Sequence, residues 1–411
     1  MSGWPFRLVH ASDFHLELPL FGVSDVPPHL RDLFLDAPYA AARRVFDTVL
    51  AEEAELLLLS GDLLSPMDAG PRGVSFLMSQ FERLAARRIP IYWATGRVDS
   101  VDGWPTSGTL PPNVHLFPRG RAAEQYYQRE GQPLARLIGA GNRQRTKVRG
   151  EDFYVESQDI FTIAVAHGSA ELDGLSGQGI DYWALGGEHE PRSIELPSAT
   201  ACYSGSPQGR QPGEPGPHGC LLVHVDDRGA PRTTFVETDS VRWSNQQIAF
   251  DATTRRADLE TRLHTRVAEL RAASPHTAQL VSWTLIGNGP LLGSLRHGAL
   301  AGELLTGLRA EFGHDEPACW SVEMVAEPAA APPTEWYEED TILGEYLRRA
   351  KHLEEHPAQA IDLKRLLSER QLAGGVAGLV SLEDPAARRR ALSHATWLGA
   401  ELLRGDGAAT T

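Results

Sequence analysis

In the first part of the chain, short apolar runs alternate with longer segments in which apolar residues recur every three or four positions. The short runs end at glycine or polar turns and predict buried strands at 6–11, 56–59, 89–94, 161–166 and 182–185. The periodic segments predict helices at 37–55 and 76–88. Strands that alternate with helices are typical of a layered α/β domain, in which functional groups gather where the strands end.

The pattern changes after residue 240. Strands are predicted at 241–250, 277–286 and 319–325, with helices at 257–273 and 300–312 between them. We therefore expect a first domain over 1–240 and a small second α/β domain over 241–326. The segment 327–335 is rich in proline and alanine, which predicts a short linker. The last part, 336–411, contains three further predicted helices, at 342–352, 359–371 and 385–403.

The composition fits a folded globular protein, because hydrophobic residues make up 42% and charged residues 23% of the chain. The formal net charge of −15 argues against a protein that coats DNA through its net charge. No apolar run approaches the roughly 20 residues of a membrane-spanning helix, and no glycine-rich loop of the ATP-binding type occurs. The chain has three cysteines without metal-type spacing and no visible signal peptide, so we expect a cytoplasmic protein.

Residues 119–149 are a local exception to the acidic balance, with eight basic residues. Four of them alternate and would share one side of an extended segment: Arg143, Arg145, Lys147 and Arg149. Such a stripe suits a phosphate backbone. A charged sheet edge that discourages strand pairing explains the same stripe equally well.

Residues that commonly ligate metals recur where predicted strands end. Asp13 and His15 stand two positions apart, so in extended backbone both side chains can reach one cation. The other residues of interest at strand ends are Asp62, Arg97, Asp99, His167 and His189. Each alone is as well explained as a turn residue, a helix cap or a buried histidine. Their order and placement together indicate a metal centre.

These stretches resemble the motifs of the calcineurin-like metallophosphoesterases, which run D-x-H, G-D, G-N-H-D, H and G-H-x-H. They are 12–15, 60–62, 95–99, 167–168 and 186–189. More narrowly, 8–16, 59–64, 181–186, 203–210 and 216–220 resemble the bacterial DNA-repair exonucleases of the SbcD and YhaO type. The resemblance covers 6–225 well. It implies a layered α/β/β/α sandwich with a small α/β capping domain and a C-terminal helical region.

The resemblance also implies a pair of Mn²⁺ or Mg²⁺ ions that hold the scissile phosphate and activate water. By their motif positions, Asp13, His15 and His189 match ligands of the first ion, Asp62 the bridge between the ions, and His167 a ligand of the second. Arg210 lies in the stretch that follows the last ligand, and we add it to the candidate DNA contacts.

Three residues depart from the family pattern, all on the side of the second ion. Arg97 replaces asparagine, Val98 replaces the general-acid histidine, and Gly187 replaces the first histidine of G-H-x-H. A guanidinium cannot ligate a metal, so we expect one ion rather than two. In one interpretation Arg97 binds the phosphate in place of the second ion, and Asp99 orients Arg97. Asp62, Arg97 and Asp99 are then the expected catalytic residues.

Three hypotheses for function remain open. The chain is a DNA-end nuclease of weakened activity, a scaffold that binds DNA ends or a partner without cutting, or a hydrolase of small phosphate esters. The resemblance further implies homodimerisation and an SMC-like ATPase partner of the SbcC type, bound through the C-terminal helices. Helix 342–352 has one apolar face, Leu343, Tyr346, Leu347 and Ala350, which binds such a partner or folds back on its own chain.

Overall fold

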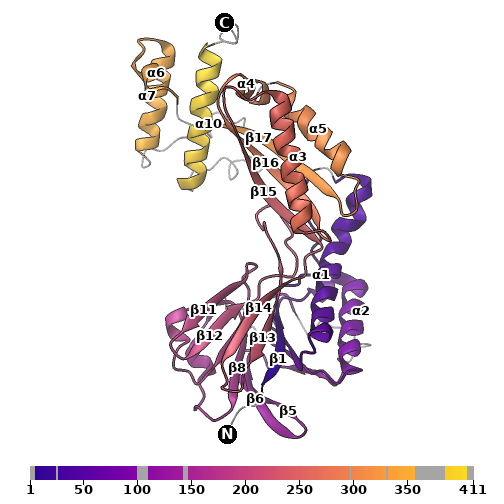
Figure 1. Cartoon of the computed structure of the whole chain (residues 1–411). Helices are drawn as coiled ribbons and strands as arrows, with labels where there is room; N and C mark the ends of the chain where they lie inside the picture. Colours follow the sequence, from indigo (N-terminus) through magenta and orange to yellow (C-terminus); the bar gives the residue numbers. More distant parts are fainter. Residues whose placement is uncertain are drawn as a thin grey trace. The chain divides into compact units, whose positions relative to one another are not determined.

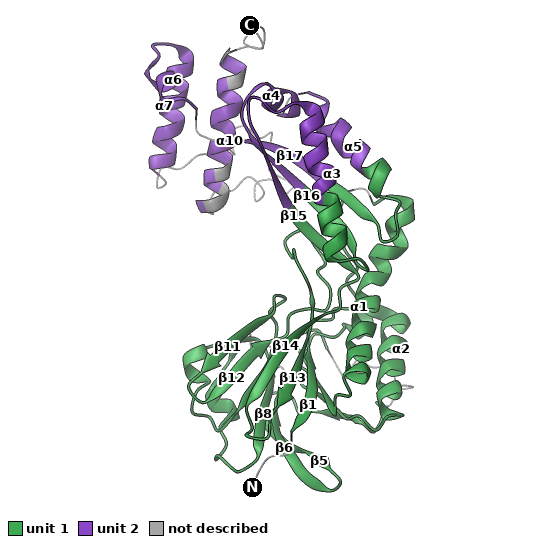
Figure 2. Ribbon diagram, in the orientation of Figure 1, with its two compact units in different colours: residues 1–245, 267–282, 309–322 green, residues 246–266, 283–308, 323–411 purple. Residues whose placement is uncertain are grey.

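The computed structural model describes residues 5–24, 26–99, 110–141, 147–296, 298–329, 332–356 and 385–404. Arg143, Arg145 and the expected helix 359–371 lie outside these residues. The chain divides into two compact units, 1–245 with 267–282 and 309–322, and 246–266 with 283–308 and 323–411 (Figure 2). None of the described helices is both long enough and apolar enough to cross a membrane.

The first unit contains two six-stranded sheets (Figure 1). The first sheet has four parallel strands, β1 (Phe6–Ala11), β2 (Leu56–Leu59), β3 (Ile91–Trp93) and β4 (Val114–Leu116). Two antiparallel strands extend it beside β1, namely β13 (Gly219–Val225) and β14 (Pro231–Glu237). Parallel strands place their carboxyl ends at one edge of the sheet, so the loops after β1, β2 and β3 are neighbours.

The second sheet also has a parallel centre, made of β6 (Gln132–Gly139), β8 (Phe161–His167), β10 (Tyr182–Gly186) and β12 (Ala199–Tyr203). Its two edges are antiparallel, β5 (Ala123–Arg129) beside β6 and β11 (Arg192–Leu196) beside β12. A small separate ladder pairs β7 (Lys147–Val148) with β9 (Ser169–Ala170).

Strand β2 shows how the sequence builds the layers. All four of its leucines are fully buried. Leu56 and Leu58 face the core between the two sheets, whereas Leu57 and Leu59 face α1 (Arg31–Ala51) and α2 (Pro66–Ala85). Because successive side chains point to opposite faces of a strand, a strand buried on both faces has to be apolar at every position.

The outer face of the second sheet is covered by the short 3₁₀ helices η3 (Gly150–Phe153) and η4 (Leu172–Gly174) with their flanking loops. A third 3₁₀ helix, η1 (Pro28–Leu30), leads into α1. The layered α/β sandwich expected from the sequence is confirmed.

The expected strands after residue 240 form a three-stranded sheet, β15 (Val241–Phe250), β16 (Ala278–Gly287) and β17 (Cys319–Pro328). The helices between them are α3 (Arg256–Ala273), α4 (Pro290–Arg296) and α5 (Leu300–Phe312). The two compact units do not divide at residue 240, because the first unit also includes 267–282 and 309–322. The expected linker 327–335 overlaps two elements, since β17 ends at Pro328 and α6 (Thr334–Glu338) begins at Thr334.

The apolar face of α7 (Ile342–Glu355) lies against α10 (Pro385–Arg404). Leu343 and Leu347 are buried together with Ala400, and the Tyr346 hydroxyl donates to the Ala395 carbonyl at 2.6 Å. Of the two interpretations of this face, the structure therefore shows the one in which it folds back on its own chain.

Candidate metal centre

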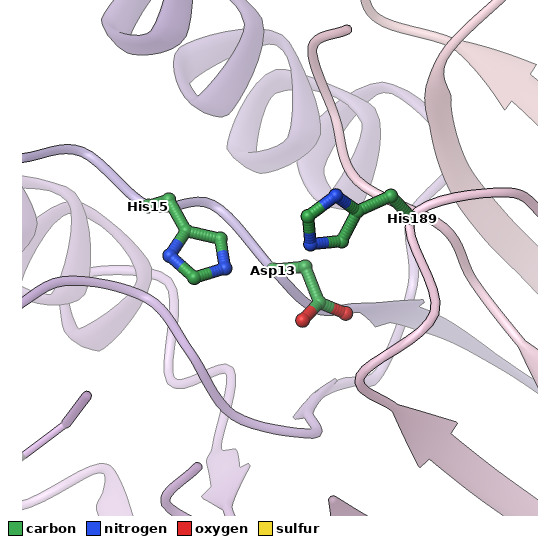
Figure 3. A group of neighbouring side chains, drawn as sticks. All are labelled: Asp13, His15 and His189. Carbon is green, nitrogen blue, oxygen red and sulfur yellow. The ribbon is translucent and has the colours of Figure 1, made fainter. Parts of the chain in front are cut away.

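The expected ligands follow the carboxyl ends of parallel strands in both sheets. They form two sets of donor atoms, each within 4.8 Å of one another. The first group is Asp13, His15 and His189 (Figure 3), and the second group is Asp13, Asp62 and His167. All five expected ligands are thus brought together, and Asp13 belongs to both groups.

Left-handed backbone positions the acidic loops. Asp13, His15 and Asp62 have φ angles of 55°, 43° and 54°, a conformation that costs a residue with a side chain about 1–2 kcal/mol. Two backbone bonds hold the loops in register, from Asp13 N to Gly61 O at 2.9 Å and from His15 N to Asp62 O at 3.0 Å. Gly61 has a φ of 90°, and a Cβ there would lie 2.6 Å from the Gly96 Cα, so only glycine fits.

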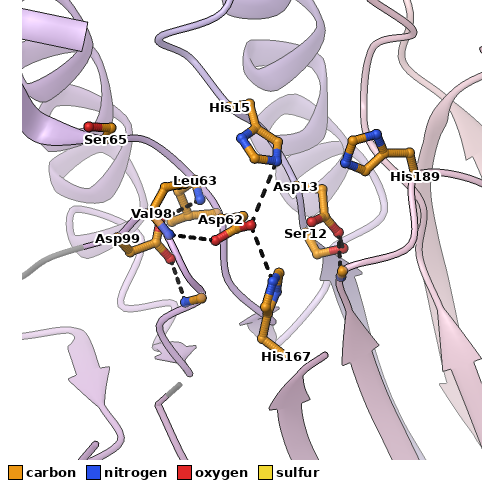
Figure 4. Close-up of polar contacts among 12 residues, drawn as sticks. Ser12, Asp13, His15, Asp62, Leu63, Ser65, Val98, Asp99, His167 and His189 are labelled. Carbon is orange, nitrogen blue, oxygen red and sulfur yellow. Dashed lines mark hydrogen bonds and ion pairs between the residues drawn. The ribbon is translucent and has the colours of Figure 1, made fainter. Parts of the chain in front are cut away.

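Each ligand histidine places its Nδ1 against an oxygen acceptor. The acceptors are Glu17 for His15 at 3.0 Å, the Ser60 carbonyl for His167 at 2.9 Å, and Glu214 for His189 at 2.9 Å. A hydrogen on Nδ1 satisfies these contacts and leaves the Nε2 lone pair for a cation. The Nε2 atoms of His15 and His167 face the Asp62 Oδ2, at 3.7 Å and 3.2 Å (Figure 4).

The carboxylates also fit a cation. Asp13 Oδ2 accepts from the Ser12 hydroxyl at 2.6 Å and from Gly187 N at 2.9 Å. Its Oδ1 is buried and has no hydrogen-bond partner among the described residues. A buried carboxylate oxygen without a donor is unfavourable, and a divalent ion would satisfy it. Carboxylates combined with imidazoles suit Mn²⁺-type ions.

The electrostatics of the second group favour positive charge. Burial opposes the charge on Asp62, but the hydrogen bond and charge of His167 together with the Val98 N–H hold its pKa well below the ordinary value. Burial also opposes the charge on His167, yet the hydrogen bond to Asp62 and the charges of Asp13 and Asp62 raise its pKa to about 9. The carboxylates therefore favour a positive charge at His167, which either a proton or a metal ion would supply.

Arg97 and Asp99 belong to neither group. Arg97 is exposed, whereas Asp99 is buried and its carboxylate oxygens accept from backbone N–H groups. Val98 contributes its backbone N–H, which donates to Asp62 Oδ1 at 2.9 Å. The catalytic roles expected for Arg97 and Asp99 stay predictions.

Gly187 lies close beside the second group and offers it no side chain. A Cβ at this position would lie 3.2 Å from Gly168 N and 3.4 Å from His167 Nε2. The carboxylate of the next residue, Glu188, accepts from Arg192 at 2.8 Å and belongs to neither group.

Arg210 lies inside the site, where we expected a DNA contact. It is 2% exposed, and its Nη2 lies 3.1 Å from His189 Nδ1 and 3.3 Å from His189 Nε2. Its Nη1 donates to the Asp13 carbonyl at 3.3 Å, and its backbone N–H donates to Glu214 at 2.7 Å. Burial lowers the pKa of Arg210, opposed by the charges of Glu214 and Asp13. The guanidinium thus helps to fix the first group.

Sequence reasoning missed Glu17 and Glu214, the carboxylates that orient His15 and His189. Glu17 continues the alternation of Asp13 and His15, which was a usable signal. Glu214 stands 25 residues after His189 and only the fold brings them together.

The basic stripe is described only in part. Lys147 and Arg149 are exposed and flank the buried Val148, as the alternation predicts. Lys147 Nζ lies 2.7 Å from Glu171, and an Arg149 Nη1 lies 3.8 Å from Glu151. The two described cations therefore have carboxylate neighbours, and DNA contact there stays a prediction.

No family model matches the chain. It is 30% identical over 259 residues to the uncharacterised metallophosphoesterase YhaO of Bacillus subtilis (strain 168). The chain is thus similar to a metallophosphoesterase over part of its length. The match covers 60% of this chain and 63% of the relative, which is less than two thirds of that protein's length.

Two solved structures share a more distant similarity. A dimetal phosphatase from Danio rerio is 12% identical with a TM-score of 0.34, covering 57% of this chain and 100% of that one. A putative 5'-nucleotidase from Staphylococcus aureus is 12% identical with a TM-score of 0.35, covering 57% and 53%. Because both TM-scores are low, the fold is described from the two six-stranded sheets of this chain alone.

Proposed function

We propose that this chain is a metal-dependent phosphoesterase that acts on DNA ends and hydrolyses them slowly. The observation that carries the proposal is the common orientation of three histidines, each held through Nδ1 by an oxygen acceptor, with Nε2 of His15 and His167 facing Asp62. Divalent ions at such a site supply Lewis-acid activation of the phosphate and of the attacking water. Asp13, His15 and His189 would hold the first ion, with Asp62 at its edge.

Slow hydrolysis follows from the residues on the side of the second group. The family's general-acid histidine is replaced by Val98, which offers only a backbone N–H, and loss of one such group typically costs about 10²–10⁴-fold in rate. We propose one bound ion rather than two, because Gly187 offers no side chain and Arg97 is an exposed cation.

DNA is the proposed substrate because of the motif resemblance and the exposed Lys147 and Arg149. We also propose that an SMC-like ATPase binds the C-terminal helices. The apolar face of α7 is covered, so among the described residues we propose the exposed leucines of α10 as the surface for it, namely Leu398, Leu402 and Leu403. Leu402→Asp is expected to abolish co-elution with such an ATPase in gel filtration while the chain stays folded.

The test of the proposed activity is cleavage of single- and double-stranded DNA with Mn²⁺ or Mg²⁺, alongside hydrolysis of bis(p-nitrophenyl) phosphate. Asp62→Asn and His189→Ala are expected to abolish DNA cleavage, while the matched control Glu190→Gln, an exposed neighbour of His189, keeps it. Cleavage of the small diester without cleavage of DNA would overturn the substrate. If the protein binds Mn²⁺ and DNA but hydrolyses neither substrate, the proposed activity is wrong and the scaffold hypothesis is supported.

A further inference from the structure

Asp99 connects the two loops that follow β2 and β3. Its side chain is 1% exposed. Oδ1 accepts from the backbone N–H groups of Leu63 at 2.6 Å and Leu64 at 3.2 Å. Oδ2 accepts from the Gly96 N–H at 2.9 Å and the Trp93 indole N–H at 3.3 Å. One buried carboxylate thus accepts from four donors, two at each of its oxygens.

The loop on the Oδ1 side carries the ligand Asp62. Asp62 and Gly61 have φ angles of 54° and 90°, so the surroundings must hold this backbone in place. The next two residues, Leu63 and Leu64, are fully buried, and their N–H groups would lose this acceptor without Asp99.

The loop on the Oδ2 side also reaches Asp62. Val98, which immediately precedes Asp99, donates its backbone N–H to Asp62 Oδ1 at 2.9 Å (Figure 4). Asp99 therefore fixes the backbone after Asp62 directly, and it fixes the Asp62 carboxylate through the peptide group beside its own.

We propose that Asp99 is a positioning residue that holds Asp62 in the geometry needed to bind metal. It is not a catalytic group that steers Arg97, because both of its oxygens face donors from the two loops. This inference rests on the proposed metal centre, and it can be tested without measuring turnover.

Asp99→Asn is the sharpest variant because it keeps the size of the side chain. An amide has one oxygen and one NH₂ group. Its NH₂ must therefore face either the N–H groups of Leu63 and Leu64 or those of Gly96 and Trp93. One of the two loops is released in either orientation.

Asp181→Asn is the matched control. Asp181 Oδ2 also caps a backbone N–H, that of Thr162 at 2.7 Å. Asp181 precedes β10 and Thr162 lies near the start of β8, so this contact is at the opposite end of these strands from His167 and Gly186.

The experiment is calorimetric titration of the full chain with Mn²⁺, together with thermal unfolding in the absence of metal. Asp99→Asn is expected to raise the Mn²⁺ dissociation constant by about 10–100-fold, as outer partners of metal ligands do. Asp181→Asn should lower the melting temperature and leave the dissociation constant unchanged. A lower melting temperature for Asp99→Asn with an unchanged dissociation constant would overturn the proposal, since that is the result for a merely structural residue.

Two further outcomes have a defined meaning. If Asp99→Asn does not fold, Trp93→Phe decides, because it removes one donor to Oδ2. A raised dissociation constant in that variant supports the proposal and an unchanged one overturns it. If the unaltered chain binds no Mn²⁺, the proposed function itself fails. If the unaltered chain binds Mn²⁺ and Asp99→Asn binds it equally well, only the proposal about Asp99 fails.

Discussion

The two ligand groups differ in how they are supported. In the first group, His15 and His189 are oriented by the carboxylates of Glu17 and Glu214. In the second group, His167 is oriented by a main-chain carbonyl, that of Ser60. A carboxylate partner makes a ligand imidazole a stronger base toward metal than a neutral acceptor does.

The surroundings of the groups also differ. The first group has the buried guanidinium of Arg210 against His189, a positive charge that opposes a cation. The second group has the backbone of Gly187, which carries no side chain, beside His167. We expect the two carboxylate partners to outweigh the charge of Arg210, so that the first group binds an ion more tightly than the second.

The largest expected effect compares a ligand from each group. His15→Ala should weaken Mn²⁺ binding by more than about 100-fold, because losing even an outer partner of a ligand costs about 10–100-fold. His167→Ala should weaken it less, since His167 belongs only to the second group. Dissociation constants from titration of both variants measure the difference. Equal losses would mean that the two groups form one site of equal strength.

A smaller effect is expected when the outer partner of the first group is changed. Glu214→Gln should weaken Mn²⁺ binding by about 10–100-fold, because Glu214 accepts from His189 and from Arg210 N. Ser60 cannot be changed in the same way, since its contact with His167 is through the main chain. Glu190→Gln, next to His189 in sequence, serves as the control. Equal Mn²⁺ affinities of the Glu214→Gln and Glu190→Gln variants would contradict the proposed role of Glu214.

A separate effect, on stability rather than on metal binding, concerns the residue behind Ser60. His10 is fully buried, with Nε2 2.8 Å from the Ser60 hydroxyl and Nδ1 3.1 Å from the Tyr182 hydroxyl. Burial lowers the pKa of His10 to about 3, against a small opposing contribution from Leu185. Between about pH 6.5 and pH 3 the unfolded chain therefore binds one proton more than the folded chain at this residue.

The free energy of unfolding should accordingly fall as the pH falls through this range, by up to about 1.4 kcal/mol per pH unit from His10. His10→Gln should reduce that slope by the same amount. Urea unfolding at several pH values between 4 and 7 measures it for both chains. An unchanged slope would show that His10 becomes charged in the folded protein.

Much of the fold could be predicted because buried strands of a layered α/β domain are short apolar runs with turns at their ends. The bounds of β1, β2, β15 and α5 agree with the expected ranges to the residue. The edge strands were missed where polar and apolar residues mix, as in β14, in which no residue is fully buried. Helix α2 begins at Pro66 rather than Phe76, because it continues across a kink at Gly70.

The candidate ligands could be predicted because each stands at the end of a recognisable strand or within four residues of it. The roles of Arg97 and Asp99 could not, since they lie two residues apart in one loop and the sequence does not say which side chain turns inward. Arg210 was expected among the DNA contacts, but it is buried. Its burial depends on Glu214 and His189, which only the folded chain brings beside it.

Both ligand groups take donors from both six-stranded sheets. Asp13, His15 and Asp62 follow strands of the first sheet, and His167 and His189 come from the second. A chain in which only one sheet has formed therefore lacks a complete group, so an ion would bind only after the two halves of the sandwich have docked. Ion binding and assembly of the sandwich are then thermodynamically linked, and an ion at 100 times its dissociation constant would add about 2.7 kcal/mol to the stability of the assembled state.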